Sequence, residues 1–293
     1  MDISKENIDK VGYLNENFKI FHIKDMKDIK FDYHHHEFNK ITILISGDVD
    51  YLVEGKSYKL KPWDILFVSN TEIHKPIINP EKFYERIVIW INPKYIESHN
   101  YGDDLFTCFN ISSKNKSNLL RLNQTDLDNI KNLLFSIKAA DNSSDFGHVI
   151  LKNSLFMQFL VLINRLSLKN DNTSDDVEYD ETIQQIFNYI NENLNKDLSI
   201  DTIANKFFMS KYYLMRKFKS QTGSSLHSYI VQKRLIYAKS LIKKGYLMSD
   251  ACIECGFKDY SSFVRAFKKS YGVSPKHYLD RINEFEKNPF EIE

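Results

Sequence analysis

Short apolar runs separated by turn residues fill the first third of the chain. The runs occupy residues 41–45, 49–54, 57–60, 65–68 and 83–91. They are broken by Gly, Pro, Asn and Asp, as in Ser46-Gly47-Asp48. Strands of this length, spaced by about ten residues, are typical of a barrel or a sandwich. The pattern therefore predicts β-structure over residues 18–91.

The apolar period changes from two to that of a helix at residue 124. Leu127, Ile130, Leu133, Leu134 and Ile137 fall on one helical face. Residues 149–168 form a second predicted helix, apolar around most of its circumference, so it needs partners on several sides. The polar run KNDNTSDDVEYD at residues 169–180 predicts a linker. We expect only helices beyond it.

An internal repeat is the strongest signal in the chain. Residues 214–229 (LMRKFKSQTGSSLHSY) match residues 263–278 (FVRAFKKSYGVSPKHY) at an offset of 49 residues. Six of sixteen positions are identical, which predicts two copies of one compact helical unit. The identical pairs are Arg216/Arg265, Phe218/Phe267, Lys219/Lys268, Gly223/Gly272, Ser225/Ser274 and Tyr229/Tyr278.

Each copy has the pattern of a helix-turn-helix. In the first, Asp197 or Ser199 can cap a short helix, Ser210 caps the next, and Gly223 ends it. In the second copy, Gly256 forms the turn, Asp259 or Ser261 can cap the helix that follows, and Gly272 ends that helix.

The positions left outward carry side chains suited to DNA. Arginine, hydroxyl and small apolar groups at one-turn spacing fit major-groove edges, and flanking lysines fit phosphates. The alternative is a helical bundle with a solvated basic face.

Length and composition bound the class of protein. The 293 residues are enough for two domains, and 42% hydrophobic residues exclude a wholly disordered chain. No apolar run approaches the ~20 residues that span a bilayer, and residues 1–20 show no secretory pattern. Three cysteines fit a reducing cytosol, so we expect a cytoplasmic protein. We expect Cys252 and Cys255 to be buried as small hydrophobes, since no second ligand pair completes a zinc site.

The net charge of +1 hides an asymmetry. Residues 1–180 carry 22 basic and 27 acidic residues, whereas residues 196–279 carry 16 basic and 5 acidic residues. A neutral chain with one basic part indicates a polyanion-binding module attached to another domain.

Residues 196–280 resemble the DNA-binding module of the AraC/XylS family of bacterial transcription regulators. The resemblance lies in LSIDTIA, MSKYYLMRKFK, RLIYAKSLI, CGFKDYSSFVRAFKK and YGVSPKHY. It implies two helix-turn-helix units joined by a long helix near residues 226–244, with two recognition helices in successive major-groove segments. Met215 departs from the polar residue often found there. The implied DNA-binding residues are Lys211, Tyr212, Met215, Arg216, Lys219, Lys258, Tyr260, Ser261, Ser262, Arg265 and Lys268.

The N-terminal part resembles the cupin-like sensor barrel of many members of that family. The resemblance lies in His34-His35-His36, Gly47 and His74. Alternation places His34 and His36 on one strand face, as two metal ligands would be. Lys40 stands where metal cupins have a glutamate, and its charge opposes a cation. Trp63 replaces the glycine usual before Asp64.

We therefore expect no metal and no cofactor, and a small organic effector such as a carbohydrate in the barrel. By analogy with cupins, His34, His36, Lys40 and His74 point into the barrel and are effector-binding candidates. Tyr51 and Trp90 are further candidates, as rings on which a sugar or an apolar ring can stack.

The expected fold is multi-domain: a cupin-like barrel at 1–110, a helical connector at 111–169, a linker at 170–180, and an all-α double helix-turn-helix domain at 181–293. The expected function is that of a transcription regulator, an activator rather than an enzyme. The resemblance implies double-stranded DNA, a small effector, RNA polymerase and a second copy of the chain as partners, and no membrane. The alternatives are a metal-dependent cupin enzyme with an appended helical region, and an effector-independent DNA binder.

Overall fold

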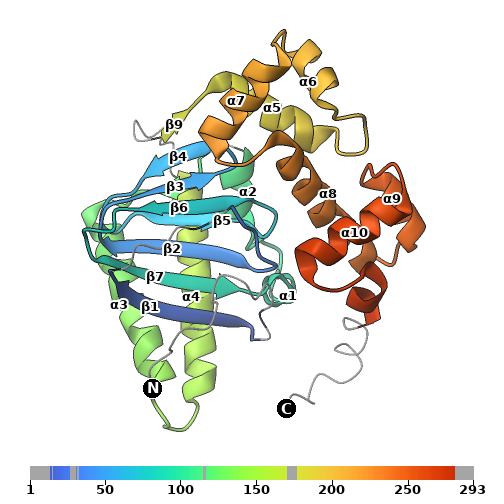
Figure 1. Ribbon diagram of the computed structural model, residues 1–293. Helices are drawn as coiled ribbons and strands as arrows, with labels where there is room; N and C mark the ends of the chain where they lie inside the picture. The colour runs from blue at the N-terminus through green and yellow to red at the C-terminus, as the bar shows by residue number, and fades with distance from the viewer. Residues whose placement is uncertain are drawn as a thin grey trace. The chain divides into compact units, whose positions relative to one another are not determined.

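The computed structural model describes residues 14, 16–26, 31, 33–114, 117–169 and 177–280. The chain divides into two compact units, Met1–Glu178 and Tyr179–Glu293. The first contains the strands and four helices, and the second is helical after its first residue (Figure 1). This agrees with the fold class expected from the change of hydrophobic period.

Two antiparallel sheets make up the β-structure of the first unit. The five-stranded sheet has the order β1-β7-β2-β5-β8, and the four-stranded sheet has the order β6-β3-β4-β9. The expected strand runs are present, and β1 and β6 add two strands that no separate run indicated. The strands are β1 (Phe18–Asp25), β2 (Asn39–Ser46), β3 (Val49–Val53), β4 (Lys56–Lys59), β5 (Ile65–Val68), β6 (His74–Ile78), β7 (Tyr84–Ile91), β8 (Leu119–Leu120) and β9 (Val177–Tyr179).

The two faces of the larger sheet enter different cores. On β2, Ile41 and Ile43 are fully buried in a core shared with the helices. Leu44, from the opposite face, packs with Tyr51 and Tyr58 of the other sheet. Alternation of side chains along a strand produces this division. The space between the sheets is therefore the interior expected for a cupin-like barrel.

Among the described residues, the first unit contains the helices α1 (Pro93–Glu97), α2 (Thr107–Lys114), α3 (Gln124–Asp141) and α4 (His148–Lys169). Helices α3 and α4 run side by side (Figure 1). Helix α4 is long and apolar enough to cross a membrane by length and composition alone. Phe156 and Phe159 of this helix are fully buried in the core against the sheet. The buried Asn164 side chain accepts a hydrogen bond from the Cys108 backbone N–H, which ties α4 to α2.

Trp63 shows how an unfavourable turn residue is retained. Its φ is 71°, in the left-handed region where glycine is the usual residue. The ring packs against the helix-facing core, and the Lys131 ammonium of α3 lies 4.4 Å from its centroid. Packing of the indole thus offsets the backbone strain that the missing glycine leaves in the turn.

The predicted linker is shorter than its composition suggested. Residues 177–179 form β9, at the edge of the four-stranded sheet. The sequence did not reveal this strand, because three residues, Val177 and Tyr179 with one polar residue between them, are too few for a periodic signal. Residues 170–176 lie outside the described residues.

The second unit consists of α5 (Glu181–Glu192), α6 (Ile200–Lys206), α7 (Lys211–Thr222), α8 (Leu226–Lys243), α9 (Met248–Glu254) and α10 (Tyr260–Tyr271), followed by helical residues 275–280. Helices α6 and α7 form one helix-turn-helix, α9 and α10 form the other, and α8 connects them as expected. Cys252 and Cys255 are buried beneath α10. Burial raises the pKa of the Cys255 thiol to about 12, so this thiol stays protonated at neutral pH.

Two histidines are buried in the first unit. His36 is 6% exposed and His74 is fully buried. Burial, which disfavours the charged imidazolium, holds the pKa of each ring well below its usual value of 6.5, and the nearby Lys40 adds to this effect. Both rings are therefore neutral in the folded protein at neutral pH.

Because His36 and His74 are buried and neutral, we expect acid to destabilise the first unit. The unfolded chain takes up protons below pH 6.5 and the folded chain does not. The free energy of unfolding of the first unit therefore has its full value above pH 6.5 and decreases as the pH falls below it. The expected loss is about 1.4 kcal/mol per pH unit for each histidine. Urea unfolding at pH 7.5, 6.5 and 5.5, followed by tryptophan fluorescence, measures it, because both tryptophans lie in this unit.

The matched control for this prediction is the double variant His36→Gln/His74→Gln. It should show a shallower dependence of the unfolding free energy on pH, whatever its absolute stability. An equal slope in both proteins would assign the acid sensitivity to other groups.

Candidate nucleic-acid interface

The two predicted recognition helices, α7 and α10, begin with side-chain caps. The Ser210 hydroxyl accepts a hydrogen bond from the Tyr213 N–H at 3.2 Å. The Asp259 carboxylate accepts one from the Ser262 N–H at 2.7 Å. Each cap satisfies a backbone donor that the first helical turn leaves without a partner. Of the two candidates for α10, the structure selects Asp259 over Ser261.

Two of the six repeated pairs, the glycines and the serines, build the same joint after each recognition helix. Gly223 and Gly272 have φ values of 69° and 74°, a left-handed cap that glycine adopts without strain. Ser225 caps α8, and Ser274 accepts a hydrogen bond from the His277 N–H at 3.2 Å.

The repeated aromatic residues fix the inner face of each recognition helix. Phe218 of α7 lies 5.7 Å from Tyr229, measured between ring centroids. Phe267 of α10 lies 5.6 Å from Tyr278 in the same way. All four rings are buried. Folding therefore accounts for the repeated Phe, Gly, Ser and Tyr.

The remaining repeated residues, Arg and Lys, face solvent in both copies. Arg216 and Lys219 on α7, and Arg265 and Lys268 on α10, are all exposed. Packing does not explain why the same two cations occupy matching positions on two helices. The repeat thus separates the residues that fold each unit from those available to a partner.

The structure places the other predicted DNA-binding residues on the same helices or beside them. Tyr212 is 71% exposed and Met215 is 41% exposed on α7, and Tyr260 is 47% exposed on α10. Lys211, Lys258 and Ser261 are also exposed, whereas Ser262 is half-buried. Their exposure agrees with the outward positions deduced from the sequence.

Arg265 is held in place by its own helix. Its guanidinium donates a hydrogen bond to the Ser262 hydroxyl at 2.9 Å. The backbone N–H of Ser262 in turn binds Asp259, which lowers the pKa of that carboxyl. Arg265 is therefore oriented near the start of α10, and Asp259 lies close enough to offset part of its charge.

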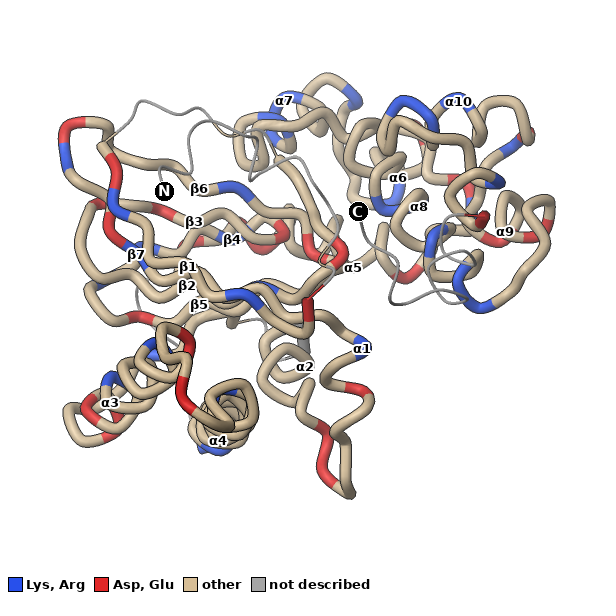
Figure 2. The backbone as a smooth tube through the Cα atoms, turned by 90° about the horizontal axis from the view of Figure 1, so that it is seen from below, with Lys and Arg blue, Asp and Glu red and all other residues tan. Residues whose placement is uncertain are grey.

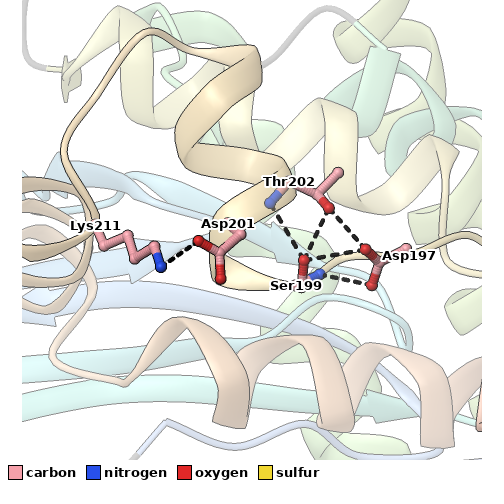
Figure 3. Close-up of polar contacts among 5 residues, drawn as sticks. All are labelled: Asp197, Ser199, Asp201, Thr202 and Lys211. Atoms are coloured by element: carbon pink, nitrogen blue, oxygen red, sulfur yellow. Dashed lines mark hydrogen bonds and ion pairs between the residues drawn. The ribbon is translucent and has the colours of Figure 1, made fainter.

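Lys211 has a partner inside the first helix-turn-helix. Its ammonium forms an ion pair with Asp201 of α6 (Figure 3). Both side chains are 61% exposed, so the pair contributes little stability. The contact nevertheless joins the two helices of the unit. A phosphate contact by Lys211 has to compete with it.

Several other basic residues of this domain are used within the fold. Lys217 pairs with Asp180 at 2.8 Å, and Lys239 lies 4.2 Å from the Tyr271 ring centroid. Lys206 lies 4.8 Å from the ring of Tyr189. Basic residues recur along the C-terminal helices (Figure 2), but the net charge overstates how many can reach DNA.

A cleft of about 1100 Å³ opens between the two helix-turn-helix units. Residues of α8 line it together with residues before α6 and residues of α9 and α10. Arg265 and Lys258 line it as well, together with Lys196 and Lys269, which the sequence interpretation had not selected. Their only sequence signal was the excess positive charge of residues 196–279.

In the first unit, the predicted effector residues form one cluster. The ring centroid of His74 lies 4.3 Å from that of His34 and 4.8 Å from that of His36. One detail of the prediction is wrong: His34 and His36 do not share a strand face. They lie before β2, and His34 makes an isolated backbone bridge to His74.

The cluster extends to the remaining candidates. Tyr51 stacks on His74 with centroids 5.9 Å apart, and the Lys40 ammonium lies 5.8 Å from the Tyr51 ring. Trp90 is opposite Lys40 on the neighbouring strand. It reaches the histidines through Phe38, a residue the sequence interpretation missed because a lone aromatic at a strand start indicates core.

The hydrogen bonds of two histidines define which ring nitrogen carries the proton. Nδ1 of His36 lies 2.6 Å from the Phe38 carbonyl oxygen, and Nδ1 of His74 lies 3.3 Å from that of Glu72. A carbonyl oxygen only accepts, so Nδ1 is the protonated nitrogen in each ring. Nε2 of each ring is then a buried acceptor that has no hydrogen-bond partner among the residues that the structure describes. Within the described ranges, no group of three or more His, Cys, Asp or Glu side chains is arranged to hold a metal ion.

Known proteins resemble both the helical part and the longer chain. A family model described as a helix-turn-helix domain matches residues 203–281. The HTH-type transcriptional activator RhaS of Salmonella schwarzengrund (strain CVM19633) is 26% identical over 247 residues, covering 84% of this chain and 86% of the relative.

Two solved structures are similar over different lengths. The DNA-binding domain of AdpA in complex with a target DNA is 23% identical and covers 36% of this chain and 96% of its own, with a TM-score of 0.33. ToxT from Vibrio cholerae is 18% identical and covers 90% of this chain and 98% of its own, with a TM-score of 0.35.

The matched domain contains both recognition helices, and the match to RhaS extends over the barrel as well. Both agree with the resemblance carried by the duplicated helical motif. Over residues 203–281 the chain carries a helix-turn-helix domain similar to the DNA-binding module of the AraC/XylS transcription regulators.

Proposed function

We propose that the protein is a sequence-specific DNA-binding transcription regulator that inserts α7 and α10 into successive major-groove segments. The observation that carries this proposal is the repeated Arg and Lys pair, exposed at matching positions of two helices whose other repeated residues serve folding. The recognition helix of a helix-turn-helix contacts base edges from one exposed face. The family model and the RhaS relative support the same function.

The exposed residues divide by chemistry into base-reading and phosphate-binding groups. Arg216 and Arg265 suit the two acceptors of a guanine edge. Ser261 and Ser262 suit other polar edges, and Met215 suits a thymine methyl. The phosphate group consists of Lys211, Lys219, Lys258 and Lys268, with Tyr212 and Tyr260 contributing hydroxyls.

The regulator is an activator in this proposal, as the relative RhaS is described to be. Activation makes RNA polymerase a partner. The enzyme alternative has less support, because the relatives are transcription regulators and Lys40 stands among the three histidines. An effector-independent DNA binder would need no polar cluster inside the barrel.

The barrel cluster supports a hydroxyl-rich effector, such as a carbohydrate. The Nε2 atoms of His36 and His74 are acceptors with no hydrogen-bond partner in the described part of the chain, so a ligand that donates suits them. Lys40 is a donor and disfavours a cation. Hydroxyl groups donate and accept, and therefore satisfy both kinds of partner. Tyr51 and Trp90 provide rings on which a sugar face can stack.

The outer face of α4 supports a homodimer. Ile150, Val161 and Leu168 are 72%, 36% and 64% exposed. Their spacing of eleven and seven residues places them along one line of the helix. Exposed apolar side chains in a line are typical of a helix that packs against another. A second copy of the chain, packed on α4, would cover this line and present two DNA-binding domains.

The base-reading assignment predicts the effects of single substitutions. Arg216→Ala and Arg265→Ala should each weaken specific binding by about 1–3 kcal/mol and relax the preference at one base pair. Lys268→Ala should weaken binding to all sequences alike and reduce the salt slope by about 1, because a phosphate contact carries no sequence information. Titration of a duplex selected by the full-length protein from a random library measures both.

Lys244→Ala is the matched control, since Lys244 is exposed at the end of α8 and lies on neither recognition helix. It should bind specific DNA as the unmodified protein does. If both arginine variants kept full specificity, the assignment of α7 and α10 as recognition helices would be wrong.

The effector assignment predicts that Lys40→Met weakens binding of a sugar. A panel of neutral monosaccharides and sugar acids is screened by the rise in melting temperature of the full-length protein. A sugar that stabilises the protein should bind Lys40→Met about ten- to a hundredfold more weakly, because a hydrogen bond from a charged donor is lost. Calorimetric titration gives the affinity.

The exposed Lys59 on β4 provides the control, and Lys59→Met should bind the sugar normally. Metal analysis completes the test. Stoichiometric metal in the purified protein, lost on chelation and on substitution of His36 or His74, would contradict the effector assignment and favour the enzyme alternative.

The dimer assignment predicts that Ile150→Asp yields monomers, because a carboxylate would be buried at the centre of the contact. Sedimentation equilibrium of the full-length protein gives the mass. Phe146→Asp is the control: Phe146 is also exposed, but it lies in the α3–α4 loop, before α4 begins. A dimeric Ile150→Asp protein would exclude this face of α4.

A further inference from the structure

Arg234 lines the cleft between the two helix-turn-helix units and contacts the loop before α6. Arg234, on α8, donates from Nε to the Leu194 carbonyl oxygen at 3.0 Å and from Nη2 to the Lys196 carbonyl oxygen at 2.7 Å. Both carbonyls belong to the loop between α5 and α6. The rigid guanidinium fork therefore holds the loop that leads into the first helix-turn-helix.

Gly256 brings the second unit against the same loop. It follows α9 with a φ of +85°. A Cβ at this position would overlap the Leu194 carbonyl oxygen and lie 3.0 Å from Nε and Nη2 of Arg234. The loop after α9 and the loop before α6 thus meet backbone to backbone. Only glycine permits this approach.

A series of polar contacts connects this loop to α7 through α6. Asp197 accepts hydrogen bonds from the hydroxyls of Ser199 and Thr202 at 3.0 and 2.7 Å. Ser199 caps α6, and Asp201 in the first turn of that helix pairs with Lys211 at the start of α7 (Figure 3). The loop, α6 and α7 are therefore linked side chain by side chain.

The link from Gly256 to α10 is equally short. The Phe257 ring lies 5.4 Å from that of Phe263, a buried residue of α10. Asp259, three residues after the glycine, caps α10. Movement of Gly256 relative to Leu194 would therefore move α10 relative to α7.

We propose that Arg234 and Gly256 are positioning residues that fix the separation of α7 and α10, and with it the number of base pairs between the two DNA segments that one chain reads. The inference rests on the proposed DNA-binding function. Two linked recognition elements bind best when their span matches that of their sites. Each unit already packs on α8, through Tyr229 in the first and a shared buried core in the second. The Arg234 and Gly256 contact adds a second connection across the cleft, which limits binding to one spacing.

The experiment compares Gly256→Ala with Gly245→Ala in the full-length protein. Gly245 has the same φ of +85°, but a Cβ at this position would have no neighbouring atom within 4 Å. Both variants therefore carry the same backbone strain, and only Gly256→Ala separates the two loops. The probes are a library-selected duplex, the same duplex with one base pair inserted or deleted between the α7 and α10 segments, and a duplex with only the α7 segment intact.

The unmodified protein and Gly245→Ala should bind the altered spacings about tenfold more weakly than the selected one. Gly256→Ala should bind the selected spacing about tenfold more weakly and prefer a different spacing or none. It should bind the single-segment duplex normally, which shows that the first helix-turn-helix is folded. Equal spacing preference in Gly256→Ala and Gly245→Ala would overturn the proposal.

Arg234 provides an independent test. Arg234→Lys keeps the charge but cannot bridge two carbonyls, and Arg234→Met removes charge and donors. Both should lose spacing preference while retaining single-segment binding. If Arg234→Met alone did so, the effect would come from charge and the positioning role would fail. If the unmodified protein bound no DNA specifically, the proposed function itself would fail, which is a different result.

Discussion

The buried pair of aromatic rings beneath each recognition helix is the contact on which the DNA-binding domain depends. Phe218 with Tyr229, and Phe267 with Tyr278, hold the inner faces of α7 and α10 at nearly equal centroid distances. Each pair spans the glycine cap and the serine cap of the next helix. Removing either ring would leave a cavity costing about 3–5 kcal/mol. The exposed cations keep their direction because this joint does not move.

The first unit uses burial differently. Its hydrophobic contacts hold two sheets and a helical layer together, but the Nε2 atoms of His36 and His74 are acceptors without partners among the described residues. Leaving a buried polar atom unpaired costs about 1–3 kcal/mol. A fold retains such atoms where they serve a function, and a hydroxyl-bearing ligand would supply the missing donors. Under the proposed function, stability and ligand binding would therefore depend on the same residues of this barrel.

A regulator needs both a fixed and an adjustable part. The DNA-binding domain has several devices that hold helices at fixed positions, namely the caps, the aromatic joints and the Arg234 contact. In the barrel, neutral imidazoles and Lys40 form a set of groups whose hydrogen bonds would change with a ligand. An effector acts by shifting populations only if it binds one arrangement better than another. A ligand that donates to the Nε2 atoms of His36 and His74, which lack a hydrogen-bond partner among the described residues, would provide such a difference.

Hydrophobic period, turn residues and the repeat determined most of the fold from the sequence alone. Strand runs, the apolar helix, both helix-turn-helix units, the caps at Ser210, Gly223 and Gly272, and the burial of both cysteines all depend on local chemistry. Such signals lie within a few residues of one another. The outward direction of Arg216 and Arg265 followed from the same periodicity.

Tertiary structure alone decided what depends on residues far apart in the chain. No pattern indicated that Lys211 pairs with Asp201, that Phe38 joins Trp90 to the histidines, or that His34 bridges His74 outside a strand. The three-residue β9 was also invisible, since it exists only as an edge of its sheet. The sequence identified the glycine at position 256 only as a turn residue. Its contact with Leu194 appears only when two loops, distant in the sequence, pack backbone to backbone.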